Sequence, residues 1–120
     1  MKTPYNYKFI NTEYLYGVSE NNDFLKKIFS LFKEQVQTLK KELPEFLNTK
    51  NYEDLAELIH KAKSSISIFG MTEQAESLKL LEKDIRNSLN PETYKDRIFD
   101  FISDCENAVS EIKILENTLS

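Results

Sequence analysis

The fold is decided by residues 58–70, LIHKAKSSISIFG, which hold the only histidine and one of the two glycines in the chain. Apolar residues recur here every three or four positions, the pattern of a helix with one buried face. At about 100° per residue, this apolar stripe lies on the side of the helix opposite His60. Gly70 predicts a left-handed cap at the end of the helix, with Met71 folding back on Ile66. The stretch therefore predicts a helix that exposes His60.

The face of this helix centred on His60 combines small and charged side chains. Its other members are Ala56, Glu57, Lys63, Ser64 and Ser67. Lys63 lies one helical turn from His60 on the same face. We expect the small side chains to leave room for a docking partner.

Helical periodicity also covers most of the remaining chain. Apolar stripes with steps of three and four define four long segments, at about residues 22–48, 51–69, 72–88 and 91–120. Polar residues that favour helix N-caps precede or open them: Asn22, Asn51, Thr72 and Asn90. Pro44 is expected to kink or break the first segment. A short helix over residues 11–16 is expected to stop at Gly17.

These segments predict the architecture. Two glycines and three prolines in 120 residues favour long helices with short connections, and short connections make sequential helices antiparallel. We therefore expect an all-α fold, an antiparallel up-down-up-down four-helix bundle with a short extra N-terminal helix. No linker is apparent, so residues 1–120 are expected to form one domain, with an N-terminal arm and short helix over 1–21 and the bundle over 22–120.

Composition excludes several classes of partner. The formal charge is −4 without a basic block, so nucleic acid is not an expected partner. No apolar run approaches the length of a membrane span, and the start lacks the pattern of a secretory signal, so we expect a cytoplasmic protein that does not contact membranes. The single cysteine, Cys105, fits a reducing compartment. Its position on an apolar stripe favours a buried thiol over a reactive one.

The chemistry available to the sequence is narrow. One histidine and one cysteine are too few for an ordinary zinc site, and no phosphate-binding glycine loop is present. We therefore expect no metal or cofactor of the protein's own. A neutral imidazole such as His60 can attack phosphorus, and Lys63 could stabilise the charge of a phosphoryl group. From the spacing alone, an ordinary solvated histidine is the alternative.

The residues around His60 resemble the motif of histidine phosphotransfer domains. That motif runs approximately H-x-L-K-G-S/A, followed by a glycine and by a helix ending in L-E. The matching residues here are 60–65, Gly70 and 81–82. Residues 50–52 stand where the family often has G-D-W, and residues 22–24 resemble its G-D-x-x-F. The resemblance covers about residues 10–118.

The resemblance implies a role for each matching residue. His60 would be the phosphoacceptor, Lys63 the cation that stabilises the phosphoryl group, and Gly70 a structural turn. Ser64 replaces the family's glycine and could hydrogen-bond the phosphoryl group, with Ser67 as a small neighbour. Glu82 either orients the His60 ring from the next helix or is a surface acid.

The function that follows from the resemblance is that of a phosphorelay intermediate. His60 would accept a phosphoryl group from the phospho-aspartate of a response-regulator receiver domain and pass it to another receiver. The protein would be a monomeric carrier without kinase activity, and the receiver would supply Mg²⁺. A hybrid histidine kinase is a further expected partner. The alternative is a helical adaptor that binds proteins without phosphotransfer.

Overall fold

Helices account for nearly all of the chain that the structure describes. The computed structural model describes residues 7–18 and 21–118, and these residues contain no strand. The elements in chain order are α1 (Thr12–Val18), α2 (Asn22–Asn48), α3 (Tyr52–Ile68), α4 (Thr72–Arg86), the 3₁₀-helix η1 (Pro91–Thr93) and α5 (Tyr94–Glu116). The predicted all-α class is confirmed. Residues 1–6 and 19–20 of the predicted arm, and residues 119–120, lie outside the described part.

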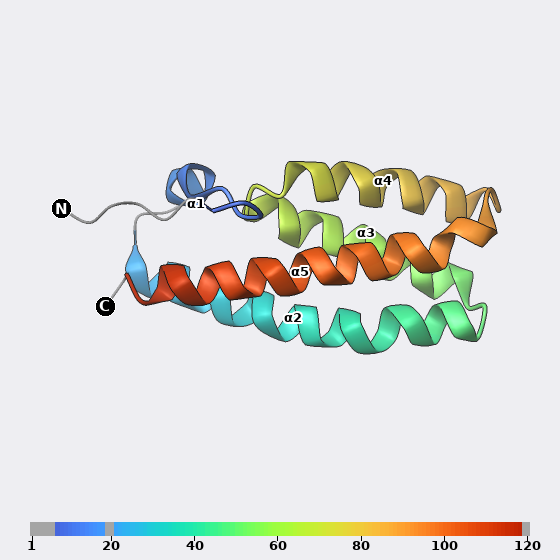
Figure 1. Ribbon diagram of the computed structural model, residues 1–120, viewed down its shortest axis with the longest axis horizontal. Coiled ribbons are helices and arrows are strands. Elements are labelled where there is room, and N and C mark those ends of the chain that lie inside the picture. Colours follow the sequence, from blue (N-terminus) through green and yellow to red (C-terminus); the bar gives the residue numbers. More distant parts are fainter. Residues whose placement is uncertain (1–6, 19–20, 119–120) are drawn as a thin grey trace.

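The four long helices lie side by side along the long axis of the molecule (Figure 1). The described chain measures 51 × 21 × 20 Å. α3 packs most extensively on α4, and α2 on α5, while α2 also contacts α3 and α4 contacts α5. Each long helix therefore buries its apolar stripe against two neighbours. This arrangement positions the exposed face of α3 beside α4 and α2.

The buried apolar side chains form one continuous core that extends along all four long helices. Aromatic rings fill both ends of it: Phe32 and Phe69 have ring centroids 4.4 Å apart, and Tyr52 meets Tyr94 edge-on at 5.9 Å. The Tyr94 hydroxyl donates to the carbonyl of Leu89 at 2.6 Å, so the polar end of this buried ring is satisfied. The core therefore gives α3 a rigid support.

Three of the long helices end in the same backbone motif. The predicted cap at Gly70 is confirmed: its φ is 70°, and the Met71 N–H donates to the Ile66 carbonyl at 3.2 Å. The corresponding hydrogen bond closes α2 and α4, although the left-handed residues there are Lys50 (φ 58°) and Ser88 (φ 56°). Composition did not reveal these two sites, because neither residue favours that conformation.

Two predicted N-caps are displaced by one residue. Asn21, not Asn22, caps α2 and accepts a hydrogen bond from the Phe24 N–H at 3.0 Å. Thr72 is the first residue of α4, and the capping position belongs to Met71, which makes no side-chain cap bond. Sequence alone does not decide which of two adjacent residues becomes the N-cap, because helix boundaries shift by one or two residues.

Pro44 does not break α2, which runs continuously from Asn22 to Asn48 (Figure 1). The prediction of a break is wrong. The proline removes one intrahelical bond at a cost of about 3 kcal/mol. Leu43 is fully buried just before it, and Phe46 and Leu47 pack against the core just after it. Their burial offsets the missing hydrogen bond.

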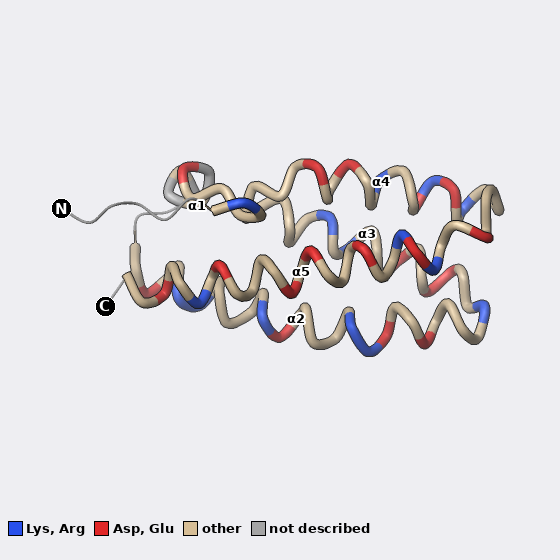
Figure 2. Tube along the Cα trace, in the orientation of Figure 1, with Lys and Arg blue, Asp and Glu red and all other residues tan. Residues whose placement is uncertain are grey.

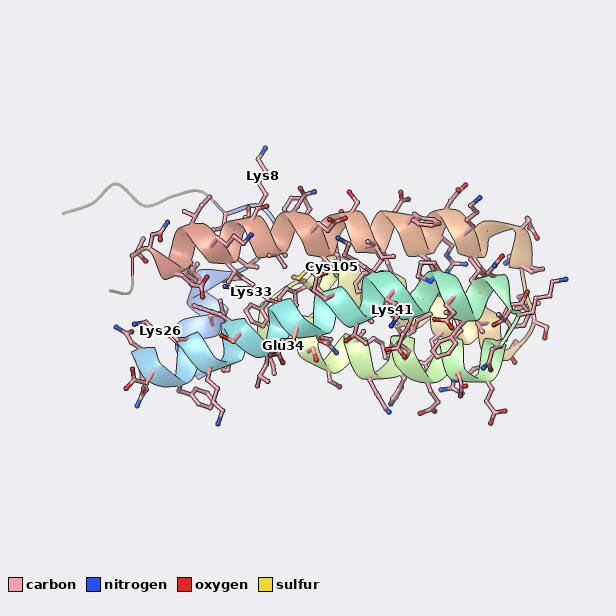
Figure 3. The ribbon with its side chains drawn as sticks, turned by 90° about the horizontal axis from the view of Figure 1, so that it is seen from below. Lys8, Lys26, Lys33, Glu34, Lys41 and Cys105 are labelled. Atoms are coloured by element: carbon pink, nitrogen blue, oxygen red, sulfur yellow. The ribbon has the colours of Figure 1, made fainter. Side chains whose placement is uncertain are left out.

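The segment before α2 is tied to the bundle by a buried carboxylate. Glu111 of α5 accepts the backbone N–H groups of Lys8, Phe9 and Ile10 at 2.6, 2.8 and 3.0 Å. The Lys8 side chain points away from the bundle (Figure 3), so its backbone alone makes this contact. α1 continues to Val18, so the prediction that Gly17 ends this helix is wrong.

Charged residues of both signs are mixed along the long helices (Figure 2). Several of them pair between helices, for example Lys33 with Glu116 at 2.6 Å and Arg97 with Asp84 at 2.8 Å. Within the described residues, no helix combines the length and the apolar character needed to cross a membrane.

Candidate functional site

Helix α3 carries His60 and is anchored at both ends. At its start, Asn51 accepts from the Asp54 N–H at 3.4 Å and donates to the Asp54 carboxylate at 2.8 Å, which confirms the predicted cap. At its end, Gly70 closes the helix about 15 Å from His60. Anchoring at both ends, together with the buried stripe between them, fixes the position of His60 on the bundle surface.

The His60 side chain is exposed, with 59% of its surface open to solvent. Ser64 and Ser67 on the same face are also exposed, and the Ser67 hydroxyl donates to the Lys63 carbonyl at 2.7 Å. Ala56 was expected on this face, but it is 1% exposed and belongs to the core. Because α3 packs closely on α4, a residue one turn from His60 toward α4 is already covered.

Glu82 of α4 reaches the His60 ring. Both of its carboxylate oxygens lie 3.2 Å from Nδ1 of His60, and its side chain is only 12% exposed. Of the two interpretations that the sequence left open, a surface acid does not fit this position. The carboxylate lies between α4 and α3 and faces the imidazole.

Three cationic or ring nitrogens surround this carboxylate. Burial raises the pKa of Glu82, but hydrogen bonds from Lys63, Arg86 and His60 outweigh burial and lower its pKa to about 2. Glu82 is therefore an anion at neutral pH. An anionic carboxylate only accepts hydrogen bonds, so Nδ1 of His60 must be the donor. In the neutral ring this leaves the lone pair on Nε2.

Lys63 leans toward α4. Its ammonium lies 2.8 Å from Oε1 of Glu82, and its side chain is 24% exposed. The lysine is therefore close to the same carboxylate as His60, and its charge is partly neutralised in this state. An ammonium has three N–H donors, so this contact leaves others for a further anion.

Arg86 and Glu57 complete the cluster, and the sequence interpretation gave them no role in the site. Nε of Arg86 donates to Oε2 of Glu82 at 2.8 Å, and a terminal guanidinium nitrogen donates to Glu57 at 3.1 Å. These contacts raise the pKa of Arg86 further above its ordinary value, the Glu82 bond being the larger cause. The signal in the sequence was the four-residue spacing of Glu82 and Arg86, which favours a pair on one helix face.

Among the surface cavities, two lie between neighbouring long helices. One, of about 250 Å³, is a mostly apolar groove between α2 and α3, which we call the α2/α3 groove; it is lined by Ile28, Leu31, Phe32, Gln35, Ser65, Ile68 and Phe69. Leu31 is 56% exposed at its rim. The other, of about 320 Å³, lies between α4 and α5. Ser65 and Ile68 place the first groove on the helix that carries His60.

Two other kinds of site, a metal cluster and a reactive thiol, can be checked in the described part of the chain. Within residues 7–18 and 21–118, no group of three or more His, Cys, Asp or Glu side chains is placed to hold a metal ion. Cys105 is 1% exposed, with its sulfur inside the bundle (Figure 3), and burial raises its pKa to about 12. The prediction of a buried thiol is confirmed.

Comparison of the chain with protein-family models matches no family, and searches of curated proteins and of solved structures give no significant match. The site is therefore interpreted from its own geometry and from the resemblance of its motif.

Proposed function

We propose that the protein is a phosphorelay intermediate that carries a phosphoryl group on His60. One observation carries the proposal: an exposed imidazole has its Nδ1 held by an ionised carboxylate, so Nε2 faces solvent with a lone pair. An ordinary solvated histidine has no such partner. A buried carboxylate that fixes the ring and its tautomer is typical of histidines that act in chemistry.

The transfer step uses only the ring and a phosphorylated partner. The Nε2 lone pair attacks the phosphorus of an aspartyl phosphate, forming a P–N bond. The P–O bond to the aspartate breaks, and its electrons return to the aspartate carboxylate. In the reverse sense, phospho-His60 donates to the aspartate of a second receiver. Glu82 stabilises the positive charge that develops on the ring, as a carboxylate does behind a reacting histidine.

Lys63 and the two serines surround the position of the phosphoryl group. We assign Lys63 the role of neutralising charge on the transferred group, because it lies within reach of the same carboxylate as His60. Ser64 is a small, exposed donor one helical turn after His60, and Ser67 is a further small, exposed residue of α3. Gly70 has no part in the chemistry and serves to end α3.

We propose a receiver domain as the partner that docks on this surface. The proposed docking surface is the exposed face of α3 together with the α2/α3 groove, where Leu31 and Ile68 present apolar side chains. A receiver that brings its aspartate to His60 must cover adjacent residues of α3, and an apolar groove there supplies binding energy. The receiver would contribute the aspartate and Mg²⁺, because in-line transfer needs charge neutralisation.

The remaining features of the proposal follow from the same role. In this proposal the protein acts as a monomeric, cytoplasmic carrier without kinase activity or a cofactor of its own, and a hybrid histidine kinase is a further proposed partner. The proposed topology is an antiparallel up-down-up-down four-helix bundle in one domain. The short connections between helices and the packing of each long helix on the next support this topology.

The test is transfer from a receiver phosphorylated with ³²P. We expect label that is labile in acid and stable in alkali, and its complete loss in His60→Gln. Lys63→Ala should slow the transfer while leaving the fold intact by circular dichroism. Label that persists in His60→Gln would sink the assignment of the site.

The alternative is a helical adaptor that binds partners without phosphotransfer, which the exposed α2/α3 groove also favours. A receiver that binds the protein but never transfers its label to it would contradict phosphotransfer. If that receiver binds Leu31→Ala with unchanged affinity, the α2/α3 groove is not its docking surface. A partner that binds through the groove, does so equally well in His60→Gln and yields no label would support the adaptor.

A further inference from the structure

The carboxylate of Glu82 is held from two sides. Its Oε1 pairs with Lys63 of α3 at 2.8 Å, and its Oε2 accepts from Nε of Arg86 at 2.8 Å. Nδ1 of His60 lies 3.2 Å from each of these oxygens. One cation on each oxygen keeps the carboxylate turned squarely toward the imidazole. Loss of either cation would leave one oxygen without its charged donor.

Arg86 does more than neutralise Glu82. Its guanidinium also donates to Glu57 at 3.1 Å, and Glu57 lies on α3 three residues before His60. The arginine therefore links the carboxylate on α4 to the turn of α3 that presents the histidine. A lysine at this position would offer a single charged point on a flexible stem, whereas the planar guanidinium can bind two carboxylates with fixed geometry.

We propose that Arg86 is a positioning residue that, through Glu82 and Glu57, keeps the proton on Nδ1 of His60 and so leaves Nε2 as the reacting nitrogen. The consequence for phosphorylation rests on the proposed function. Without Arg86, Oε2 loses its charge-assisted donor, and the carboxylate is free to rotate toward Lys63. Nδ1 then loses part of its acceptor, and the ring populates the tautomer with the proton on Nε2.

The single histidine makes this proposal directly measurable. In protein labelled with ¹⁵N, long-range ¹H–¹⁵N correlation reports the tautomer of His60 without overlap, at about pH 8.5 where an ordinary imidazole is neutral. We expect Nδ1–H to dominate in the wild type. In Arg86→Ala, the fraction of Nε2–H should rise about 3- to 10-fold, less than the loss of about 10- to 100-fold in metal affinity or activity that follows removal of the partner of a metal-bound histidine. Arg86→Lys should not restore the wild-type ratio.

Arg97→Ala is the matched control, because it removes the other arginine of the chain, which lies on α5 and forms an ion pair of equal length, 2.8 Å, with Asp84 of α4. It should leave the tautomer ratio unchanged. Glu57→Gln weakens the contact of Arg86 with residue 57. The tautomer ratio of His60 in this variant should therefore lie between those of the wild type and Arg86→Ala. This variant also keeps the proposal testable if Arg86→Ala unfolds.

A second readout uses phosphoramidate, which needs no protein partner. The imidazole attacks phosphorus, the P–N bond of the donor breaks and ammonia leaves. ³¹P NMR distinguishes phosphorus on Nε2 from phosphorus on Nδ1. We expect reaction at Nε2 in the wild type and in Arg97→Ala at equal rates, and a lower rate in Arg86→Ala, because a smaller fraction of the ring then carries its lone pair on Nε2.

The outcomes separate this proposal from the proposed function. A tautomer ratio in Arg86→Ala equal to that in Arg97→Ala would overturn the role of Arg86, whatever receivers do. A changed ratio and a slower reaction with phosphoramidate would support that role, even if no receiver transfers its phosphoryl group to the protein.

Discussion

Nδ1 of His60 lies 3.2 Å from both carboxylate oxygens of Glu82, which is 22 residues later in the chain. The contact crosses from α3 to α4, so it depends on the close packing of these two helices. The contact joins Glu82, at the boundary of the core, to His60, on the surface. The geometry of the proposed reaction centre is set by the same packing that stabilises the bundle.

Replacing Glu82 should change how stability depends on pH. Its pKa in the folded protein is about 2, below the ordinary value of 4.5, so the ionised carboxylate stabilises the fold above about pH 4.5. This stabilisation is lost as the pH falls from 4.5 toward 2. At neutral pH, Glu82→Gln should lower the free energy of unfolding by about 1–2 kcal/mol, since solvent screens part of the network. Urea titrations at several pH values measure the difference.

The control for this prediction is Glu76→Gln, which alters an exposed carboxylate on the same helix. It should change the free energy of unfolding by less than about 0.5 kcal/mol at neutral pH. A difference between wild type and Glu82→Gln that stays constant down to pH 2 would contradict the lowered pKa of Glu82.

Glycine should stabilise the protein at Lys50 and Ser88, two of the three described non-glycine residues with a left-handed backbone; the third is Asn90. Lys50 and Ser88 have φ near 57°, where a side chain strains the backbone. We expect Lys50→Gly and Ser88→Gly each to raise the free energy of unfolding by about 0.5–1 kcal/mol. The matched control is Lys41→Gly in the middle of α2, which should cost about 1 kcal/mol. An equal decrease in the free energy of unfolding in all three variants would contradict the left-handed conformation of Lys50 and Ser88.

The two glycines should respond in opposite ways to alanine. A Cβ on Gly70 would lie within 2.4 Å of the Asn11 Cβ, at a φ of 70°. Gly70→Ala should therefore cost about 2–3 kcal/mol. A Cβ on Gly17 meets nothing within 4 Å, and alanine favours its helix, so Gly17→Ala should be neutral or slightly stabilising. Thermal melts compare the two, and a smaller loss for Gly70→Ala than for Gly17→Ala would contradict this packing.

Cys105 should react slowly with iodoacetamide while the protein is folded. Burial raises the pKa of its thiol from 9.0 to about 12, so the thiolate fraction at pH 8 falls by about three powers of ten, and access is also blocked. We expect urea to accelerate alkylation at least about 100-fold. Mass spectrometry follows the reaction, and comparable rates with and without urea would mean that α5 opens readily in the native state.

The sequence predicted those features that depend on residues close together in the chain. Periodicity identified the four long helices, because each buries one stripe of apolar residues. The caps at Asn51 and Gly70 were also found, since a cap involves residues within one turn. The exposed position of His60 followed from the angle between it and its own helix's stripe.

Features that depend on neighbouring helices were missed. The burial of Ala56 and the contact of Arg86 with Glu57 both arise from the approach of α4 to α3, which no single-helix pattern reports. Pro44 was expected to kink or break α2, and the break does not occur, because local propensity omits the core contacts on either side of the proline. The left-handed conformation of Lys50 reflects the tight reversal between α2 and α3 rather than its own preference.

The carboxylate of Glu111 receives three consecutive backbone N–H groups from residues more than 100 positions earlier in the chain. During synthesis on the ribosome, residues 8–10 emerge long before their acceptor, which is translated only in the second half of α5. The segment before α1 therefore cannot complete its hydrogen bonds until most of α5 has been made. It is the earliest part of the described chain to be synthesised and among the last to reach its final place.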